Sequence, residues 1–484
     1  MHASITVKIL GLLLMFFSVL ANLPPLFVSL IYSDGMVLPF LHSMLSLFIL
    51  GFIMWATTAR TRKDLSTRDG FLVVTLFWAV LGTAGCLPFL LSDQVTLSVT
   101  DAVFESLSGL TTTGATVISG LETLPKSILF YRQQLQWLGG MGIIVLAVAL
   151  LPMLGIGGMQ LYRAESPGPV KDNKLVPRLA ETAKALWYIY LSLTVICALA
   201  YWLVGMDLFD AISHSFTTVA IGGFSTYDAS LGHFDNPAIE VIAIVFMFIA
   251  GVNFALHFAA WRNRSLRSYF DDPEFKFYAL ILLSVSVVTI LVLVYSDVYA
   301  SMSEAFIKGL FQVVSIATTT GFTTADFNSW PLFLPYVLLY AAIIGACAGS
   351  TGGGMKVVRI LLIFKQGIRE VQRLIHPKAV IPVKLGKKVI SDRVIESVWG
   401  FFAVYVMAFM AMLLALLTTG MDIITAFSAV GACINNLGPG LENVAQTYGA
   451  LPATAKWILC LAMLLGRLEV FTLLVLFTPM FWRR

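Results

Sequence analysis

Ten apolar runs, each long enough to cross a lipid bilayer as a helix, dominate this sequence of 484 residues. A helix needs about 20 apolar residues to cross roughly 30 Å of hydrocarbon. The runs lie near residues 5–31, 37–58, 71–91, 134–156, 185–205, 238–261, 277–299, 333–363, 395–419 and 453–481. Because only 12% of the residues are charged, there is too little polar surface to cover a soluble globule of this size. The sequence therefore predicts an all-α polytopic membrane protein with the lipid bilayer as its solvent.

Lysine and arginine residues gather in alternate loops between these runs. The basic loops are 60–68, 163–184, 262–276, 356–393 and the C-terminal pair 483–484. Since basic loops stay on the cytoplasmic side and the number of runs is even, both termini are expected to be cytoplasmic. The opposite loops hold many acids, Glu105 among them, and few bases such as Arg132. Together these acids predict an outer vestibule that attracts cations, although each acid taken singly fits an ordinary solvated loop.

Four short segments in the opposite loops resemble one another. Each is too short to cross the membrane but suits a re-entrant helix that ends at a glycine. The segments are 101–115, 210–224, 308–322 and 425–439, with the glycines Gly114, Gly223, Gly321 and Gly438. The next apolar run carries a second glycine, 26 residues later in the first case and 28 residues later in the others: Gly140, Gly251, Gly349 and Gly466. This regularity predicts a fourfold internal repeat.

One glycine in each repeat suits a filter for a monovalent cation. An alkali cation that loses its water needs several oxygen ligands at once, and backbone carbonyls can supply them. Such a backbone needs glycine, which adopts left-handed conformations without a Cβ clash. Each short helix would also aim the partly negative C-terminal end of its dipole at the cavity below the filter. The predicted filter residues are Thr111, Thr112, Thr113, Gly114, Ala220, Ile221, Gly222, Gly223, Thr318, Thr319, Thr320, Gly321, Asn435, Asn436, Leu437 and Gly438.

The eighth apolar run is interrupted by a glycine-rich stretch at 345–354, which has five glycines in ten residues. Glycine at this density disfavours continuous helix, so we expect an unwound loop across the pore below the filter, and no other run has such a stretch. The alternative is a face of small residues that allows close helix packing. The candidate gate residues in this loop are Gly345, Gly349, Ser350, Thr351, Gly352, Gly353 and Gly354.

Arg467 follows the repeated glycine Gly466 in the middle of the last run. An arginine at membrane depth is costly and tends to face a cavity or an acidic partner. We expect Arg467 to face the pore beside the glycine-rich loop, and pairing with loop or helix-end carbonyls is the alternative. Lys356, just beyond the loop, is interpreted as an anchor that reaches toward the membrane surface.

The filter segments TTTGAT, AIGGFST, TTTGFTT and NNLGPG, with the paired runs around them, resemble the Trk/Ktr/HKT superfamily of potassium uptake proteins. The additional N-terminal hairpin resembles the bacterial TrkH type. The resemblance implies M1–pore loop–M2 repeats in a pseudo-fourfold arrangement around one pore, and glycine in all four filter positions implies K+ selectivity. The fourth segment departs most, since Asn435, Asn436 and Leu437 replace three threonines. The implied domains are 1–66 for the hairpin and 67–165, 166–268, 269–380 and 381–484 for the repeats.

The resemblance also implies a function, which is potassium uptake across a bacterial inner membrane driven by the membrane potential. It implies a gate formed by the loop and Arg467, a homodimer, and control by a cytosolic TrkA-like ring that binds nucleotides. The stretch GSTGGGMK at 349–356 lies inside an apolar run and matches no nucleotide-binding loop. K+ is the expected permeant ion, and no organic cofactor, enzymatic activity or nucleic acid partner is expected. A potassium symporter coupled to protons or sodium stays open as the alternative.

Overall fold

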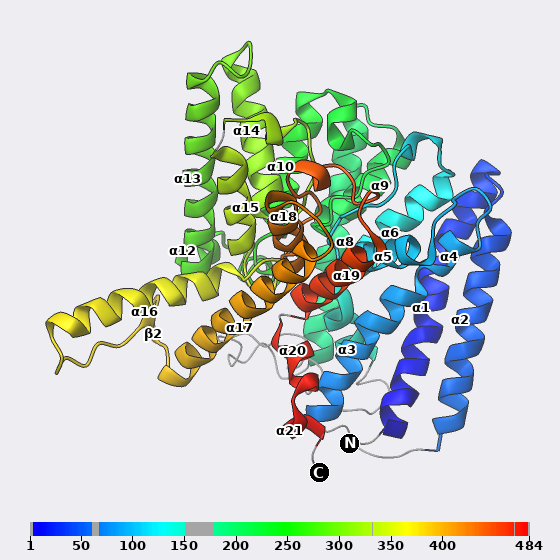
Figure 1. Ribbon diagram of the computed structural model, residues 1–484, viewed down its shortest axis with the longest axis horizontal. Coiled ribbons are helices and arrows are strands. Elements are labelled where there is room, and N and C mark those ends of the chain that lie inside the picture. The colour runs from blue at the N-terminus through cyan, green and yellow to red at the C-terminus, as the bar shows by residue number, and fades with distance from the viewer. Residues whose placement is uncertain (1–2, 61–66, 151–178, 332, 469, 483–484) are drawn as a thin grey trace.

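The computed structural model describes residues 3–60, 67–150, 179–331, 333–468 and 470–482, which are mostly helical. Two long helices, α1 (Ala3–Tyr32) and α2 (Val37–Thr58), pack as a hairpin at the right-hand edge of the molecule in Figure 1. Among the described residues the only strands are β1 (Lys384–Leu385) and β2 (Lys388–Val389), an antiparallel pair. The fold is therefore all-α apart from this small hairpin.

After the N-terminal hairpin, one order of elements recurs: a long helix, a short helix, an irregular segment and a second helix. The first group is α3 (Thr67–Ala84), α4 (Leu87–Leu90), α5 (Val99–Leu110), η1 (Leu121–Thr123) and α6 (Lys126–Leu150). The second is α8 (Leu179–Leu203), α9 (Leu208–Val219), η2 (Ser230–Phe234), α10 (Pro237–Ala250), α11 (Phe254–Asn263) and α12 (Arg267–Asp271). The third is α13 (Pro273–Tyr295), α14 (Met302–Ala317), η3 (Phe327–Ser329), α15 (Leu334–Ile344) and α16 (Val357–Ile375). The fourth is α17 (Asp392–Leu417), α18 (Ile423–Ile434), η4 (Glu442–Val444), α19 (Ala453–Arg467), α20 (Phe471–Leu474), η5 (Val475–Phe477) and α21 (Pro479–Trp482).

The four short helices α5, α9, α14 and α18 occupy the four similar segments of the sequence. Each begins at a Ser or Asp whose side chain accepts a hydrogen bond from a backbone N–H of the first turn: Ser98, Asp207, Ser301 and Asp422. Such N-caps satisfy donors that a helix start leaves unpaired. The two acids among these caps, Asp207 and Asp422, therefore have a local structural role.

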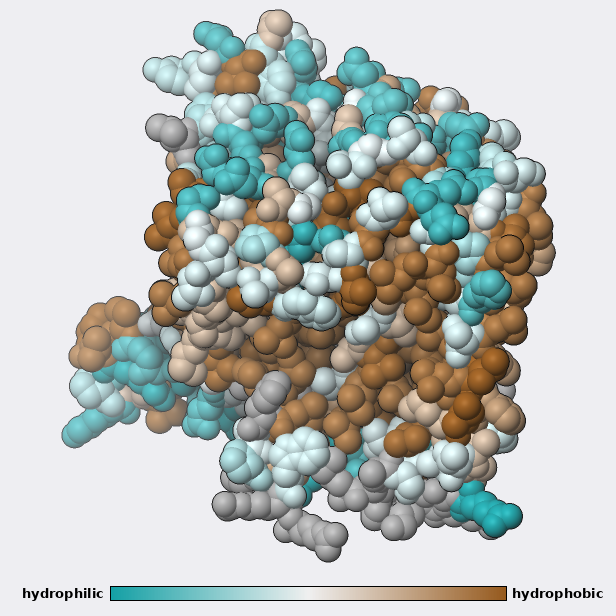
Figure 2. Space-filling model, turned by 45° about the vertical axis from the view of Figure 1, so that its right-hand side comes forward, coloured by the Kyte–Doolittle hydropathy of each residue, from teal (hydrophilic) through white to brown (hydrophobic). Residues whose placement is uncertain are grey.

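Six stretches of the described chain are long and apolar enough to cross a membrane: Ser4–Tyr32, Val37–Thr58, Arg68–Leu90, Ala183–Leu203, Pro273–Tyr295 and Asp392–Leu417. The pair α10 and α11 makes a seventh if it is counted as one bent span. Figure 2 shows a continuous hydrophobic band across the middle of the visible face, with hydrophilic residues gathered above it. This distribution suits a protein surrounded by lipid at that level.

The predicted runs 238–261 and 453–481 are not the continuous helices that we expected. The run 238–261 is divided into α10 and α11, which meet at 90°. The run 453–481 contains α19, which ends at Arg467, and then only short helical pieces. The end of the run 134–156 and the domain boundary at 165–166 lie outside the described residues.

The N-terminal hairpin depends on close contact between Gly11 and Gly51. A Cβ on either glycine would lie 2.7 Å from the carbonyl oxygen of the other. We expect Gly11→Ala to cost about 1–3 kcal/mol, since backbone atoms must move apart, and to lower the melting temperature of the detergent-solubilised protein. Gly367→Ala on α16 is the matched control, because its Cβ would meet nothing within 4 Å. Equal melting temperatures for the two variants would contradict this prediction.

Candidate functional site

The four short helices end in the same backbone geometry. After each C-cap comes a residue with positive φ, and the N–H of the following residue bonds to a carbonyl five positions back, which is a Schellman ending. The positive-φ residues are Thr112 (57°), Ile221 (54°), Thr319 (70°) and Asn436 (53°). The backbone bonds are Thr113 to Ser108 at 2.9 Å, Gly222 to Thr217 at 2.9 Å, Thr320 to Ser315 at 2.8 Å and Leu437 to Ala432 at 2.8 Å. Four different sequences thus adopt one turn.

The irregular segments after these turns lie against one another in cyclic order. A Cβ added to each of the four predicted filter glycines would meet atoms of the next segment. The contacts are Gly114 with the carbonyl oxygen of Gly222, Gly223 with that of Thr320, Gly321 with Cδ of Pro439 and Gly438 with the carbonyl oxygen of Gly114. The structure therefore brings the four glycines together in one closed ring, which we call the glycine ring.

Side chains around the glycine ring are buried, whereas three of its glycines are partly exposed. The partly exposed glycines are Gly114, Gly223 and Gly321, whose φ values are 80°, 78° and 85°. The predicted filter residues that are less than 3% exposed are Thr111, Thr112, Thr113, Ala220, Ile221, Thr318, Thr319, Thr320, Asn435, Asn436 and Leu437. Among the predicted filter residues, partial exposure is therefore confined to these three glycines.

The asparagines of the fourth segment join it to other parts of the chain. Asn436 Nδ2 donates to Thr113 Oγ1 of the first segment at 3.0 Å. Asn435 Oδ1 accepts a hydrogen bond from the hydroxyl of Tyr405 at 3.0 Å. In the first and third segments, threonine pairs bond to each other instead, at 2.8 Å in both cases. The fourth segment therefore keeps the shared backbone turn with different side-chain partners.

Each second helix breaks at or near its repeated glycine. α6 is non-helical at Gly142 (φ 45°, ψ −155°), α10 ends before Gly251, and α19 ends at Arg467. Residues 345–356 separate α15 from α16. The prediction that only the eighth run is interrupted is therefore wrong. The sequence signal was present in the repeated glycines, but single glycines inside apolar helices are common and did not indicate a break.

The breaks place glycine backbone against the C-terminal ends of the short helices. A Cβ on Gly139 would collide with the carbonyl oxygen of Leu110, which ends α5, and one on Gly466 with that of Ile434, which ends α18. At the other two ends the close pairs are Gly140 with Ala220 and Gly352 with Thr318. A side chain at any of these glycines would push the second helix, or at Gly352 the loop 345–356, away from the ends of the short helices.

The glycine-rich loop 345–356 is hydrogen-bonded to three of the four segments. Thr351 Oγ1 donates to the carbonyl oxygen of Val219 at 3.0 Å. The N–H of Gly353 donates to Thr319 Oγ1 at 2.7 Å, and the N–H of Gly354 donates to the carbonyl oxygen of Asn435 at 3.1 Å. The loop therefore lies directly against the helix-end side of the glycine ring.

The other side of the loop is held by residues that the sequence did not mark as functional. The N–H of Cys347 donates to the carbonyl oxygen of Gly251 at 3.0 Å, and the N–H of Phe254 donates to that of Gly349 at 3.0 Å. The N–H of Ala348 donates to Glu274 Oε1 at 2.6 Å. The backbone at the break between α10 and α11 thus forms hydrogen bonds with the loop that separates α15 from α16.

Arg467 reaches the segment that the loop does not bond. Its guanidinium donates to Thr112 Oγ1 at 3.4 Å and to the carbonyl oxygens of Gly139 and Gly140. It also donates to the carbonyl oxygen of Thr351 at 3.5 Å. Arg467 therefore lies beside the glycine-rich loop and pairs with backbone carbonyls. That it faces a pore stays a prediction.

Lys356 is not the surface anchor that we expected. Lys356 is 8% exposed and its φ is 76°. Its ammonium group donates to the carbonyl oxygen of Gly352 within the loop. A helical residue could have reached toward the membrane surface, but this one precedes α16 and folds back. Its charge therefore lies on the glycine-rich loop.

Several outer acids have fixed partners, which the sequence reasoning missed. Glu105 and Arg132 form a buried ion pair at 2.7 Å, with side chains 0% and 1% exposed. Asp101 pairs with Lys456 at 2.6 Å and links the first and fourth groups. Backbone N–H groups hold the pKa of Asp422 below its usual value, with Thr425 the main donor. Assigning Glu105 to a solvated vestibule was therefore wrong, because it lies behind the glycine ring.

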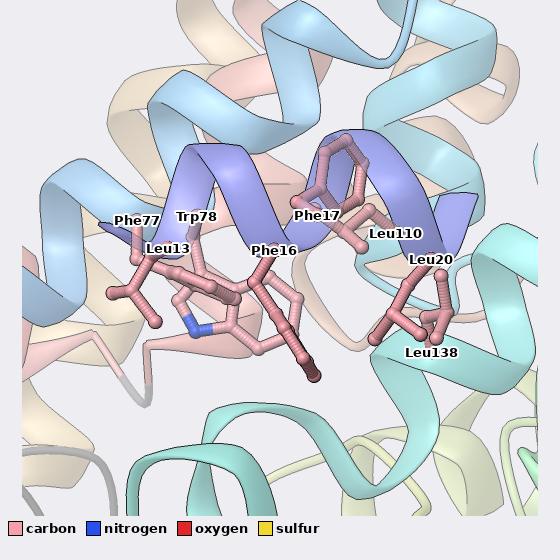
Figure 3. Close-up of a pocket in the computed structure, with 8 residues that line it drawn as sticks. All are labelled: Leu13, Phe16, Phe17, Leu20, Phe77, Trp78, Leu110 and Leu138. Atoms are coloured by element: carbon pink, nitrogen blue, oxygen red, sulfur yellow. The ribbon is translucent and has the colours of Figure 1, made fainter. Parts of the chain in front are cut away.

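An apolar cavity lies between α1 and α3 near the end of α5 (Figure 3). Its walls are Leu13, Phe16, Phe17, Leu20, Phe77, Trp78, Leu110 and Leu138. The Trp78 ring also contacts Arg467, whose Cζ lies 4.9 Å from the ring centroid. The polar side-chain atom on these walls is Trp78 Nε1, a donor that cannot bind a cation, so the cavity forms no part of the candidate site.

Comparison with known proteins identifies the family. The family described as "TrkH: Cation transport protein" matches residues 38–484. The Trk system potassium uptake protein TrkH of Vibrio parahaemolyticus is 58% identical over 479 residues, which cover 99% of both chains. The protein of the same name from Escherichia coli is 55% identical over 483 residues, which cover 100% of both chains. The Trk system potassium uptake protein TrkG of Escherichia coli is 41% identical over 482 residues, which cover 100% of this chain and 99% of that protein.

The fold agrees with this relationship. The crystal structure of the potassium transporter TrkH from Vibrio parahaemolyticus matches with a TM-score of 0.91 and 55% identity over 100% of both chains. Sequence and structure lead to the same family, as the resemblance of the filter segments predicted: this chain belongs to the TrkH family of membrane-spanning cation transport proteins.

Proposed function

We propose that this chain takes up potassium across the bacterial inner membrane through the opening in the glycine ring. The observation that carries the proposal is the closed cyclic contact among Gly114, Gly223, Gly321 and Gly438. These glycines come from four distant parts of the chain, and the named potassium uptake relatives are up to 58% identical over nearly the whole length. Potassium is therefore the permeant ion that we infer.

The filter would work through backbone oxygens. In each segment the positive-φ residue at the Schellman ending is followed two positions later by the filter glycine, and three of these glycines also have positive φ. Alternating backbone handedness turns successive carbonyls toward the same side, so that a dehydrated cation can bind several at once. The short helices end at the ring, and their partly negative ends favour a cation just below it.

The loop 345–356 and Arg467 would form the gate in its closed state. Together they have hydrogen bonds to all four segments, through Val219, Thr319, Asn435 and Thr112. A permanent positive charge at this place repels a permeating cation. Opening would require these hydrogen bonds to break and the guanidinium to move aside.

The setting of the gate is also part of the proposal. The basic loops would lie in the cytoplasm with both termini, and α1 begins and α21 ends on one side of the molecule in Figure 1. On the lower left, α16, the β-hairpin and the start of α17 project from the bundle. We propose that a cytosolic TrkA-like ring controls the gate and that two copies of this chain form a homodimer, each copy with its own pore.

A symporter coupled to protons or sodium is the second candidate. Broken helices at corresponding positions are typical of such transporters, and this chain has breaks in four groups rather than one. Single-channel currents in planar bilayers separate the two mechanisms, because a coupled carrier turns over too slowly to give resolved unitary currents.

The filter assignment predicts the effect of Gly223→Ser. A Cβ here would collide with the carbonyl oxygen of Thr320, and φ is 78°, so the ring must open locally. We expect the ratio of K+ to Na+ permeability, measured with liposomes by ion substitution, to fall about tenfold, equivalent to about 1.4 kcal/mol. Gly420→Ser is the control, since its φ is 87° but its Cβ would meet nothing within 4 Å. Unchanged selectivity in Gly223→Ser would remove the second segment from the filter.

The gate assignment predicts that Arg467→Ala leaks potassium. Without the guanidinium, the closed state loses both its charge barrier and its bond to the first segment. We expect K+ flux into liposomes, without any cytosolic subunit, to rise about tenfold if the barrier falls by about 1.4 kcal/mol. Arg467→Lys keeps the charge and should stay close to the parent flux. A flux in Arg467→Ala no higher than that of the parent would contradict the role of Arg467 in closure.

A further inference from the structure

The side-chain amide of Gln136 brackets the filter glycine of the second segment. Gln136 Nε2 donates to the carbonyl oxygen of Gly222 at 2.7 Å, and Gln136 Oε1 accepts from the N–H of Phe224 at 3.0 Å. The side chain is fully buried. These two bonds lie on either side of Gly223, so the amide pairs with the backbone much as a neighbouring strand would.

Arg132 holds the same segment one helical turn earlier on α6. Residues four apart lie on the same face of a helix, and Arg132 Nη1 donates to the carbonyl oxygen of Ser225 at 3.1 Å. Its guanidinium lies 4.2 Å from the centroid of the Phe224 ring, and Glu105 fixes it from the other side at 2.7 Å. One face of a helix from the first group therefore holds the second filter segment.

Among the described residues, a side-chain amide that bonds on both sides of a filter glycine occurs only at the second segment. Gln136 lies four residues before Gly140, and the residues at the same distance before the other repeated glycines are Met247, Gly345 and Ala462, which have no amide. In the fourth segment the hydroxyl of Tyr448 donates to the carbonyl oxygen of Gly438 at 2.9 Å. In the third, Ser315 Oγ donates to the carbonyl oxygen of Phe322 at 2.7 Å. Each of these hydroxyls makes one hydrogen bond to its filter segment. Tyr448 and Ser315 both belong to the same helix group as the segment that they bond.

The second segment has the most need of such support. It contains Gly222 and Gly223 in succession, and two adjacent glycines allow their peptide planes to rotate at little cost. Its Ile221 has φ 54°, which is strained for a β-branched residue, as are Thr112 and Thr319 in the first and third segments. A carbonyl oxygen has two lone pairs, so Gly222 can bond to Gln136 and still present one lone pair to an ion.

We propose that Gln136 is a positioning residue for ion selectivity: its amide locks the peptide planes on both sides of Gly223 so that their carbonyls keep the spacing that potassium requires. This inference rests on the proposed function and adds to it a selectivity determinant outside the filter segments. Arg132 and Glu105 align the adjoining part of the same segment. Loss of the amide leaves the fold intact but lets the second segment relax toward a smaller ion.

Gln136→Met tests the inference, with Gln134→Met as the matched control. Methionine keeps the length of the side chain and removes the amide. Gln134 is also a buried amide on α6, and its Nε2 donates to the carbonyl oxygen of Leu20 at 2.6 Å, away from the glycine ring. Both proteins, the parent and Gly223→Ser are reconstituted in liposomes, and K+ to Na+ permeability ratios are compared at equal amounts of folded protein.

We expect Gln136→Met to lower the permeability ratio about tenfold, equivalent to about 1.4 kcal/mol, while Gln134→Met keeps the parent ratio. The inference is overturned if Gln136→Met has the same K+ to Na+ permeability ratio as the parent, or if Gln134→Met lowers this ratio equally. If Gln136→Met does not fold, Gln136→Glu takes its place, because it keeps the acceptor for Phe224 but sets a carboxylate oxygen against the carbonyl of Gly222. The same fall is expected there, and an unchanged ratio is contrary to the inference.

The same liposomes separate this inference from the proposed function. If the parent does not prefer K+ to Na+, the proposed function fails and the inference fails with it. If the parent prefers K+ and Gly223→Ser loses that preference while Gln136→Met retains it, the filter stands and only the role of Gln136 is lost.

Discussion

Backbone groups that leave regular helix at membrane depth must find hydrogen-bond partners inside the protein, because lipid offers none. This requirement governs the centre of the molecule. The turn of each short helix returns its N–H groups to its own carbonyls, and the loop 345–356 bonds to the carbonyls of Val219, Asn435 and Gly251. One irregular segment therefore supplies the partners of the next, and the glycine ring, the loop and Arg467 form one connected network.

The network combines a shared backbone with unequal side chains. The Schellman turn recurs four times, but the residue at its left-handed position is Thr, Ile, Thr and Asn in turn. Asparagine tolerates this conformation, whereas the β-branched Thr112, Ile221 and Thr319 are strained in it. Strain of this kind persists only where the surroundings hold it, and here a helix of the neighbouring group bonds to both sides of the next glycine.

The glycines of the second helices have two structural effects. Their glycines let backbone approach the ends of the short helices, as Gly139 does at Leu110 and Gly466 at Ile434. The helices then break at the same level, which exposes carbonyls of Gly139 and Gly140 to Arg467. The break at these glycines therefore allows close packing and also supplies carbonyl partners for the buried charge of Arg467. In the third group the break is longer and forms the loop 345–356.

The sequence by itself determined that the chain is an all-helical membrane protein, that four glycine-ended segments recur, and that 345–354 and Arg467 lie near them. These features follow from local composition and spacing, which repeat along the chain. Only the tertiary structure decided that all four second helices break, that Lys356 folds back onto the loop, and that Glu105, Arg132 and Gln136 lie behind the ring. The reason is physical: a buried polar side chain is defined by the partner that satisfies it, and each of these partners lies elsewhere in space. Gln136 looks like any polar residue in a helix until Gly222 and Phe224, 86 and 88 positions away, are brought against it.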